Sequence, residues 1–333
     1  MIKLSIILPC YNVEKYIGAC LDSIYRQDIS IEAYEVICVD DCSVDNTKGI
    51  IRTYQKRYSN ITLIEHIVNQ TAGGARNTGI DYARGEYIWF VDPDDAIGVN
   101  SLAMICDYVK KNNLDILLFN YNDADEQLKD ITPNKFFADT EDITAGCDLI
   151  EKKFSTSLNR LGLVWCRCYS RKFLNDNNIR FPIMRKSQDV VYAWRSLLLA
   201  KRVKSISDTL YTFRNNPNSV THVRKNAIII FSERYQFGLE VDKILNEFTQ
   251  SLTNNIKKQL YNTCKWCANI SYDEIFGLSS EERFKFYQLY KQNNEKIQRL
   301  YSYMSRKNKI IFTCGINYYI WYILIKIFFL THR

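Results

Sequence analysis

The sequence of 333 residues predicts an α/β fold with a mostly parallel central sheet, followed by a mainly helical C-terminal region. Over the first 120 residues or so, apolar runs bounded by turn residues alternate with amphipathic stretches, which is typical of a parallel sheet covered by helices on both faces. After Asn226 the apolar spacing becomes helical. With 47% hydrophobic residues, 24% charged residues, 12 Gly and 5 Pro, the composition excludes a fibrous or disordered chain.

The elements follow in chain order. The apolar run Leu4–Leu8 predicts a buried strand, Glu14–Arg26 an amphipathic helix, and Glu35–Val39 a second strand. Asp45–Tyr58 predicts a helix capped by Asp45, and Ile61–Ile64 a third strand. Gly74–Ala83 then predicts a helix, the β-favouring run Glu86–Val91 a fourth strand, Ser101–Asn112 a helix and Asp115–Phe119 a fifth strand. Ligands of such sheets bind beyond the carboxyl ends of the strands, so candidate functional residues are expected directly after the first, second and fourth strands.

Basic charge is concentrated in the last third of the chain. Residues 221–333 contain 17 basic and 9 acidic residues, a net charge of +8, whereas residues 1–220 contain 27 and 28, a net charge of −1. The turn-rich stretch Asn215–Ser219 marks the expected boundary between an α/β domain, 1–220, and a basic helical region, 221–333. This region suits an anionic partner such as a membrane surface or a phosphate-bearing acceptor, although a solvated basic face is the commoner meaning. It carries no nucleic-acid recognition motif, so no nucleic-acid partner is expected.

The stretch Ile310–Leu330 is long and apolar enough to span a membrane. Its Tyr and Trp residues favour a helix that lies in the membrane interface or packs on the protein. The apolar run after Lys3 is too short for the core of a signal peptide. We therefore expect a cytoplasmic protein, peripheral at the inner face of the membrane.

Eleven scattered cysteines are typical of reduced cytosolic thiols. Cys166 and Cys168, together with Cys264 and Cys267, could supply four thiolates to zinc. The close spacing of the first pair is poor for a zinc knuckle, so buried core thiols are the preferred interpretation.

Carboxylates follow two of the expected strands. Asp92, Asp94 and Asp95 come after the fourth strand and suit Mg²⁺ or Mn²⁺, which takes one or two protein carboxylates and fills its other positions with phosphate oxygens and water. A polar turn that caps the next helix is the alternative. Asp40 and Asp41 follow the second strand, where one carboxylate could accept hydrogen bonds from a nucleobase or ribose.

Between these two corners lies Asn69–Asn77, expected as a glycine-containing loop that runs into a helix. Its backbone N–H groups and Arg76 could meet a diphosphate. Gly73 and Gly74 by themselves are also compatible with ordinary turn chemistry.

Together, these motifs resemble those of the family 2 glycosyltransferases, which are inverting enzymes of GT-A fold. The matching segments are Ser5–Asn12 with Cys20–Ile24, Val39–Ser43 with Asp45–Thr47, Ala75–Ile80, and Gly85–Asp95. The resemblance covers roughly residues 3–100, with weaker matches to about 222, and four motifs in order are far more specific than any one of them.

The resemblance implies a nucleotide-sugar donor and a set of residues that bind it: Pro9, Tyr11, Asn12, Asp41, Arg76 and Asp92. Asp92 and Asp94 would hold Mg²⁺ or Mn²⁺ with Asp95 in support, and Arg76 would lie near the diphosphate. Asp189, within Ser187–Trp194, is the best match to the catalytic base, and Leu210–Val220 is similar to a later arginine-containing segment. Inverting transfer needs such a carboxylate opposite the leaving diphosphate. A helix N-cap is the alternative for Asp189.

Three positions depart from the family pattern: Cys42 and Thr71 stand where Gly is usual, and Gln188 where Glu usually precedes the base. The first two are backbone-level changes, whereas Gln188 bears on acceptor handling. The histidines His66, His222 and His332 form no triad or metal set in the sequence.

The expected function is therefore metal-dependent, inverting sugar transfer of the hexosyltransferase type to a saccharide or lipid-linked acceptor, in cell-surface polysaccharide or glycolipid biosynthesis. One alternative is a sugar nucleotidyltransferase, which would usually carry a glycine-rich phosphate loop where this chain has Pro9–Asn12. The other is an inactive sugar- or membrane-binding module, which would have little reason to keep Asp92, Asp94 and Asp189.

Overall fold

The computed structural model describes residues 2–153, 162–216, 227–269, 278–292, 294–314 and 321–326. The chain divides into two compact units, Met1–His222 and Val223–Arg333, which are described separately below. The first unit combines strands and helices, and the second is helical. The predicted fold class, a mostly parallel α/β sheet followed by a helical region, is confirmed.

A mixed sheet forms the centre of the first unit, with strands in the order β3-β2-β1-β4-β8-β6-β9-β5 and β7 paired to β6. Its strands are β1 (Leu4–Cys10), β2 (Tyr34–Asp40), β3 (Ile61–Glu65), β4 (Tyr87–Phe90), β5 (Ala96–Ile97), β6 (Ile116–Ala124), β7 (Thr132–Asn134), β8 (Arg167–Ser170) and β9 (Val203–Arg214). The first four strands are mutually parallel, β8 runs antiparallel between β4 and β6, and β9 is parallel to β6. The carboxyl ends of β1, β2, β3 and β4 therefore meet along one edge.

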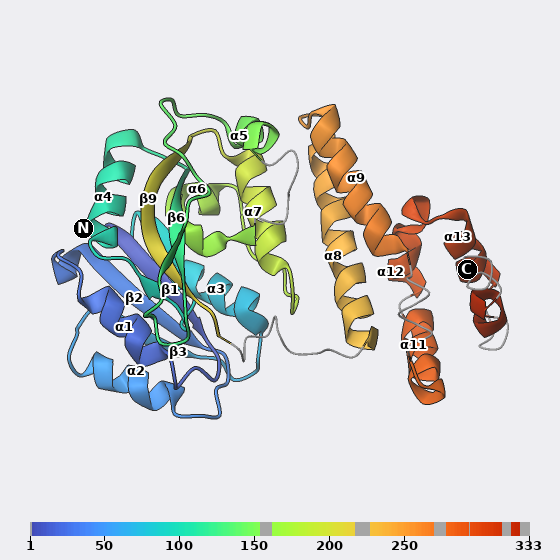
Figure 1. Ribbon diagram of the computed structural model, residues 1–333, viewed down its shortest axis with the longest axis horizontal. Coiled ribbons are helices and arrows are strands. Elements are labelled where there is room, and N and C mark those ends of the chain that lie inside the picture. The colour runs from blue at the N-terminus through green and yellow to red at the C-terminus, as the bar shows by residue number, and fades with distance from the viewer. Residues whose placement is uncertain are drawn as a thin grey trace. The chain divides into compact units, whose positions relative to one another are not determined.

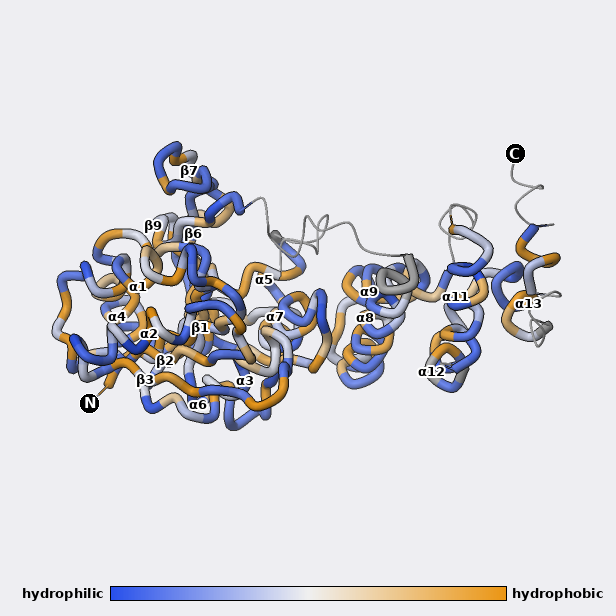
Figure 2. Tube along the Cα trace, turned by 90° about the horizontal axis from the view of Figure 1, so that it is seen from below, coloured by the Kyte–Doolittle hydropathy of each residue, from blue (hydrophilic) through white to orange (hydrophobic). Residues whose placement is uncertain are grey.

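Helices lie on both faces of this sheet. They are α1 (Ile17–Tyr25), α2 (Thr47–Gln55), α3 (Thr71–Tyr82), α4 (Ser101–Asn112), α5 (Gly146–Lys153), α6 (Arg171–Asp176) and α7 (Gln188–Leu199). In Figure 1, α1, α2 and α4 lie on one side of the sheet and α3 and α7 on the other. Every residue of β1 and β2 is buried, because a parallel strand covered on both faces has no solvated side. Figure 2 shows the hydrophobic stretches of these central strands in orange.

The five strands and four helices predicted for the first 120 residues are present, with shifted ends. The helices α1 and α2 start later than predicted because Glu14 and Asp45 bind one another's loops: the Asp45 carboxylate accepts hydrogen bonds from the N–H of Glu14 (3.0 Å) and of Thr47 (3.0 Å). Asp45 thus serves the start of α2, as predicted, although Asn46 holds the N-cap position.

The helix predicted from Gly74 is confirmed but starts three residues earlier, so the expectation of a loop is wrong for residues 71–73. The helix α3 begins at Thr71, so Gly73 and Gly74 lie inside a helix and are buried. A Cβ atom on Gly73 would lie 3.0 Å from the carbonyl oxygen of Pro182 and 3.2 Å from Cγ of Gln188. This glycine therefore permits close packing of α3 on the segment before α7, and tertiary packing overrides its low helix propensity.

The second unit contains α8 (Ala227–Phe248), α9 (Asn254–Ala268), α11 (Ser280–Gln292), α12 (Asn294–Arg299) and α13 (Arg306–Cys314). The helical pattern predicted after Asn226 is confirmed in these segments. The hydroxyl of Tyr235 on α8 donates to the carbonyl of Ala268 at the end of α9 (3.0 Å). Cys264 and Cys267 are buried in this unit, and Cys166 and Cys168 in the first.

Within the described ranges, no helix has the length and apolar character needed to cross a bilayer. Residues 315–320 and 327–330 of the apolar stretch predicted at Ile310–Leu330 lie outside those ranges, as does His222.

Candidate functional site

Polar residues from the ends of neighbouring strands meet at the carboxyl edge of the sheet. The register pairs Cys10 of β1 with Asp40 of β2, and the N–H of Asp41 donates to the carbonyl of Cys10 (2.8 Å). β4, which leads into Asp92, lies on the other side of β1. Three of the sequence-predicted segments are thus adjacent because their strands are.

The loops after β1 and β2 are fastened to each other by Asn12. Its N–H donates to the hydroxyl of Ser43 (3.0 Å), and its side-chain oxygen accepts from the N–H of Val44 (2.9 Å). Asn12 takes a positive φ of 52°, which asparagine tolerates better than most residues. Its carboxamide therefore shapes the loop pair. Beside it Pro9 is buried, whereas the Tyr11 side chain is 51% exposed and free to meet a ring.

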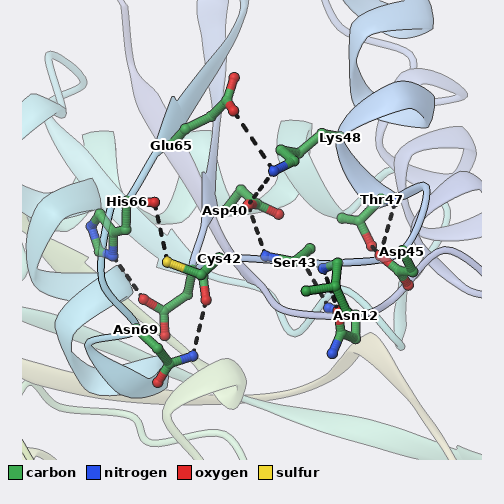
Figure 3. A network of polar contacts seen from close by, with 12 residues as sticks. Asn12, Asp40, Cys42, Ser43, Asp45, Thr47, Lys48, Glu65, His66 and Asn69 are labelled. Carbon is green, nitrogen blue, oxygen red and sulfur yellow. Dashed lines mark hydrogen bonds and ion pairs between the residues drawn. The ribbon is translucent and has the colours of Figure 1, made fainter.

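Asp41 is the centre of a buried polar cluster. Its carboxylate accepts from the N–H of Gln70 (2.7 Å) and lies 2.8 Å from Nδ1 of His66, whose Nε2 lies 2.9 Å from the hydroxyl of Thr78. The network around His66, Asn69 and Cys42 is drawn in Figure 3. An ionised Asp41 can only accept, so Nδ1 of His66 carries the proton in this arrangement.

Asp40 has a structural place in the same network. It is fully buried, accepts from the N–H of Ser43 (3.0 Å), and lies 3.9 Å from the ammonium of Lys48 (Figure 3). These contacts hold the turn that carries Asp41, so Asp40 shapes the site without facing it.

Arg76 and Asp92 form the central ion pair of the site. A terminal guanidinium nitrogen of Arg76 lies 2.6 Å from Asp92 Oδ1. Arg76 is buried, its guanidinium lies 5.3 Å from the centre of the Phe181 ring, and its Nε and other terminal nitrogen have no partner among the described residues. Because a buried donor without an acceptor is costly, these free N–H groups are suited to an anionic ligand.

The turn Asp92–Asp95 is held from behind by the end of β9. The hydroxyl of Tyr211 donates to Asp95 Oδ2 (2.5 Å) and accepts from the N–H of Asp92 (3.1 Å). The Arg214 side chain donates to the carbonyls of Asp94 (2.5 Å) and Glu126 (2.5 Å), and its N–H donates to Asp95 Oδ1 (2.7 Å). Asp95 is thus a buried support.

Asp94 points away from that support toward Asn216, whose amide donates to Asp94 Oδ2 (3.3 Å). Burial raises the pKa of Asp94, and the neighbouring Asp92 carboxylate raises it further. Burial also raises the pKa of Asp95, with added repulsion from Asp94 and Asp92. The carboxylates of the acidic turn therefore repel one another, and the repulsion is only partly offset by their hydrogen bonds and by Arg214.

Asp189 lies in the first turn of α7, one residue inside the helix. The N-cap residue is Ser187, with φ of 62° and no capping hydrogen bond, so the alternative of an N-cap role for Asp189 is wrong. Burial raises the pKa of Asp189; the Arg76 cation opposes that shift and the Asp92 carboxylate adds to it. Asp189 is thus electrostatically coupled to the Arg76–Asp92 pair.

The three departures from the family pattern have visible settings. Cys42 and Thr71 take φ of 69° and 68°, the left-handed region in which glycine is unstrained and other residues pay of order 1–2 kcal/mol. Gln188 is buried, with its Cγ close to Gly73 of α3 and its Oε1 unpartnered in the described structure. A neutral amide here avoids burying a charge against α3.

Among the described residues, no group of three or more His, Cys, Asp and Glu side chains converges on a metal position. Asp92 and Asp94 nevertheless fit a hard divalent cation in two respects. They are two adjacent carboxylates, which is the protein share that Mg²⁺ usually takes, and their mutual repulsion is the kind a cation relieves.

Sequence reasoning missed His66, Tyr211 and Asn216. His66 follows β3, whose carboxyl end lies on the same edge, so searching after the third strand would have found it. Tyr211 and Asn216 meet the acidic turn across more than 110 residues of chain, and no local pattern indicates that contact.

The architecture, a mostly parallel α/β sheet followed by a helical region with an acidic turn and a buried arginine at the carboxyl edge, is that of the GT-A glycosyltransferases. Residues 5–176 match the description "Glycosyl transferase family 2". This match covers half of the chain, and the protein belongs to glycosyl transferase family 2.

Two curated relatives are informative. The chain is 36% identical over 217 residues to a poly(ribitol-phosphate) beta-glucosyltransferase of Bacillus spizizenii, covering 63% of this chain and 32% of that protein. It is 33% identical over 221 residues to the uncharacterized glycosyltransferase EpsJ of Bacillus subtilis, covering 66% and 63%. The matches thus span about a third of the first relative and under two thirds of the second.

Two solved structures share the fold. Staphylococcus aureus TarS 1-349 in complex with UDP-GlcNAc superposes with a TM-score of 0.64 at 21% identity, covering 94% of this chain and 86% of that one. The mannosyltransferase PcManGT of Pyrobaculum calidifontis, in complex with GDP-Man and Mn²⁺, gives a TM-score of 0.54 at 16% identity, covering 90% and 85%.

Proposed function

We propose that this protein transfers a sugar from a nucleoside diphosphate donor to a hydroxyl of a cell-surface polymer, with inversion at the anomeric carbon. The observation that carries the proposal is the Arg76–Asp92 ion pair of 2.6 Å, with Asp189 coupled to both charges. This chemistry needs three groups: a cation for the leaving group, a turn with carboxylates for a metal, and a further carboxylate for the acceptor proton.

The donor would lie along the carboxyl edge of the sheet. Tyr11 offers an exposed ring to the base, and Asp41 a carboxylate to the base or ribose. Pro9 and Asn12 shape the loop beneath, and the free N–H groups of Arg76 would bind the diphosphate. The role of Arg76 is supported by its unpartnered N–H groups and that of Tyr11 by its exposed ring, and the other roles come from the family resemblance.

Asp92 and Asp94 would hold Mg²⁺ or Mn²⁺ together with the diphosphate. A divalent cation held there would supply positive charge to stabilise the departing nucleoside diphosphate. Asp95 stays behind them, fixed by Tyr211 and Arg214, and keeps the turn in place.

Asp189 would take the proton of the attacking hydroxyl. A base works best when its pKa approaches the working pH, and burial raises the pKa of Asp189 in that direction. Transfer then requires one displacement with no covalent sugar intermediate, which inverts the configuration.

Two of the relatives suggest the acceptor. The Bacillus spizizenii protein and TarS of Staphylococcus aureus, which is 31% identical over 216 residues and 64% of this chain, both carry poly(ribitol-phosphate) in their names. We propose an acceptor of that class, a polyol-phosphate polymer, for this chain, with wall teichoic acid or another cell-surface polysaccharide as the setting.

We further propose that the C-terminal unit docks on an anionic membrane surface from the cytoplasmic side. The helix α9 contains Lys257, Lys258 and Lys265 and no acidic residue, and it exposes Trp266 (61%) and Tyr261 (46%). Lysine with exposed Trp and Tyr is the composition of interfacial helices.

The test is turnover of a panel of UDP- and GDP-sugars with Mn²⁺ or Mg²⁺, followed by product analysis, for the wild type, Asp94→Ala and Asp189→Asn. One donor consumed, with loss of transfer in both variants and with EDTA, supports the proposal. Donor and metal binding without any effect of Asp189→Asn would refute the assignment of the base. Formation of a nucleotide sugar from sugar phosphate and nucleoside triphosphate would indicate the nucleotidyltransferase, and sugar binding without turnover an inactive module.

A further inference from the structure

Two exposed cations precede the proposed base on a short bend. Arg185 and Lys186 lie four and three residues before Asp189, and both side chains are exposed. Neither has a hydrogen bond or ion pair to any described residue, unlike Arg180 on the same segment, which pairs with Asp81 (2.9 Å). Their donors are therefore open to a ligand.

The bend is fixed at both ends to the helix that carries Arg76. The amide of Asn77 donates to the carbonyl of Phe181 (2.8 Å) and accepts from its N–H (2.8 Å). The hydroxyl of Thr71 donates to the carbonyl of Met184 (3.3 Å), and Gln188 packs on Gly73. Arg185 and Lys186 are thus presented from an anchored bend between Met184 and Gln188.

The site has an excess of negative charge, which favours additional cations near the acceptor. Asp92, Asp94, Asp95 and Asp189 bring four carboxylates, against which stand the guanidinium groups of Arg76 and Arg214. A metal and a diphosphate add charges that largely offset each other. An acceptor that is itself an anion would be repelled unless further positive charge lay on its path.

The short chain distance between the two cations and Asp189 places them near the acceptor. The acceptor hydroxyl must contact Asp189, and a span of three or four residues cannot exceed about 10 to 14 Å of extended chain. Every repeat of a polyol-phosphate polymer carries a phosphodiester a few bonds from its hydroxyls. A hydroxyl at Asp189 therefore brings a phosphate within reach of Arg185 and Lys186.

We propose that Arg185 and Lys186 form an acceptor subsite that binds the phosphodiester next to the hydroxyl being glycosylated. This inference rests on the proposed function. It makes the acceptor's phosphate a recognition element, so the enzyme would prefer a phosphate-bearing polyol to the same polyol without phosphate.

The experiment compares the double variant Arg185→Gln/Lys186→Gln with the matched pair Lys110→Gln/Lys111→Gln. Lys110 and Lys111 are also adjacent and exposed, and they lie in the last turn of α4, which leads into the start of β6 at the opposite edge of the sheet. The acceptors are a ribitol-phosphate oligomer and free ribitol, used with the donor found in the panel. Donor hydrolysis without acceptor and the melting temperature are recorded for all variants.

We expect the KM for the phosphate oligomer to rise by up to about 25-fold in the Arg185/Lys186 variant, since each of the two exposed cations facing an anionic partner contributes about a fivefold effect or less. The salt dependence of that KM should weaken. The KM for ribitol, the donor KM, donor hydrolysis and the melting temperature should stay at their wild-type values, and the Lys110/Lys111 pair should behave as wild type throughout.

Two results would overturn the subsite alone, and two others would mark a failure of the proposed function. The first two apply when the wild type uses the phosphate oligomer. If the variant keeps the wild-type KM for the oligomer, or if its KM for ribitol rises as much as its KM for the oligomer, the subsite is wrong and the function stands. If the wild type transfers sugar to ribitol and not to the phosphate oligomer, the proposed acceptor class is wrong and the subsite fails with it. If no donor is consumed by the wild type, the enzymatic proposal itself fails.

Discussion

The hydroxyl of Tyr211 is the contact whose removal gives the sharpest expectation. It joins two hydrogen bonds, one donated to the buried Asp95 carboxylate (2.5 Å) and one accepted from the N–H of Asp92 (3.1 Å). Tyr211→Phe removes both and leaves the ring in place, with its stacking on Trp165 at 4.5 Å between centroids.

The expected loss of stability follows from these two bonds. A hydrogen bond to a buried charged group contributes about 1.5–3 kcal/mol and a neutral one about 1 kcal/mol, so the variant should lose about 2–4 kcal/mol. For a domain of this size that is a fall in Tm of roughly 4 to 16 °C. The donor KM should rise as well, because the turn that carries Asp92 loses its support.

The loss should depend on pH with a definite sign. Burial raises the pKa of Asp95, so its ionised form destabilises the fold increasingly as pH rises through that value. Tyr211 stabilises the ionised form, and its removal raises the pKa of Asp95 further. The difference in Tm between wild type and variant should therefore be largest at alkaline pH and shrink as pH falls.

Tyr192→Phe is the matched control. Tyr192 is also fully buried, but its hydroxyl has no hydrogen-bond partner among the described residues, so its removal should be neutral or slightly stabilising. Thermal unfolding of both variants between pH 5 and 9, with donor KM at each pH, tests the reasoning. Equal Tm values for the two variants, or a difference that grows toward acid pH, would refute it.

Three further outcomes are expected. Asp189→Asn should lower the transfer rate by about 100- to 10,000-fold with donor affinity retained; it should also raise the Tm above pH 7, because the carboxylate it replaces has a raised pKa and disfavours the folded state when ionised. A fall in Tm, measured beside kcat, would contradict this. In the pH profile of wild-type kcat/KM, the apparent pKa of the acid limb should lie above the ordinary range for Asp. Asn216→Ala removes the amide that orients Asp94 (3.3 Å), so the concentration of Mn²⁺ needed for half-maximal turnover should rise by a few fold, while Asn122→Ala on the neighbouring strand leaves it unchanged. In sedimentation with vesicles, the triple variant Lys258→Gln/Lys265→Gln/Trp266→Ala should weaken binding to anionic lipid by at least tenfold. The control Lys243→Gln/Lys285→Gln changes lysines already paired with Glu240 and Glu281, so it should change the binding little. Equal effects of the two would count against α9 as the docking face.

Much of the site could be predicted because strands that follow one another in the chain are neighbours in the sheet. Asp41 and Asp92 each follow a strand that pairs with β1, so their proximity is set by local sequence and parallel topology. Asp189 could be placed only through resemblance, since its position beside the Arg76 helix depends on the long-range contact of Gln188 with Gly73.

The errors have equally specific causes. Gly73 and Gly74 have the composition of a loop, but the carbonyl oxygen of Pro182 approaches α3 so closely that a Cβ atom on Gly73 would be tightly crowded, and a helix forms there despite its glycines. Tyr211 and Arg214 lie on β9 and Asn216 two residues beyond its end; the resemblance singled out this segment, but its pairing with β5 beside the acidic turn is a long-range contact that no local pattern indicates.

The paired hydrogen bonds between Asn77 and Phe181 have a consequence for how such enzymes diversify. Asn77 follows Arg76 directly, and Phe181 begins the segment that leads to Asp189, so one carboxamide links the helix of Arg76 to the segment that carries the proposed base. The bend that carries Arg185 and Lys186 lies between Phe181 and Asp189, and its backbone is held by the contacts of Thr71 with Met184 and of Gly73 with Gln188. If these two exposed side chains bind the acceptor as proposed, substitutions there would change which polymer is accepted while the anchored backbone keeps its place, so new acceptor preferences could arise without rebuilding the site.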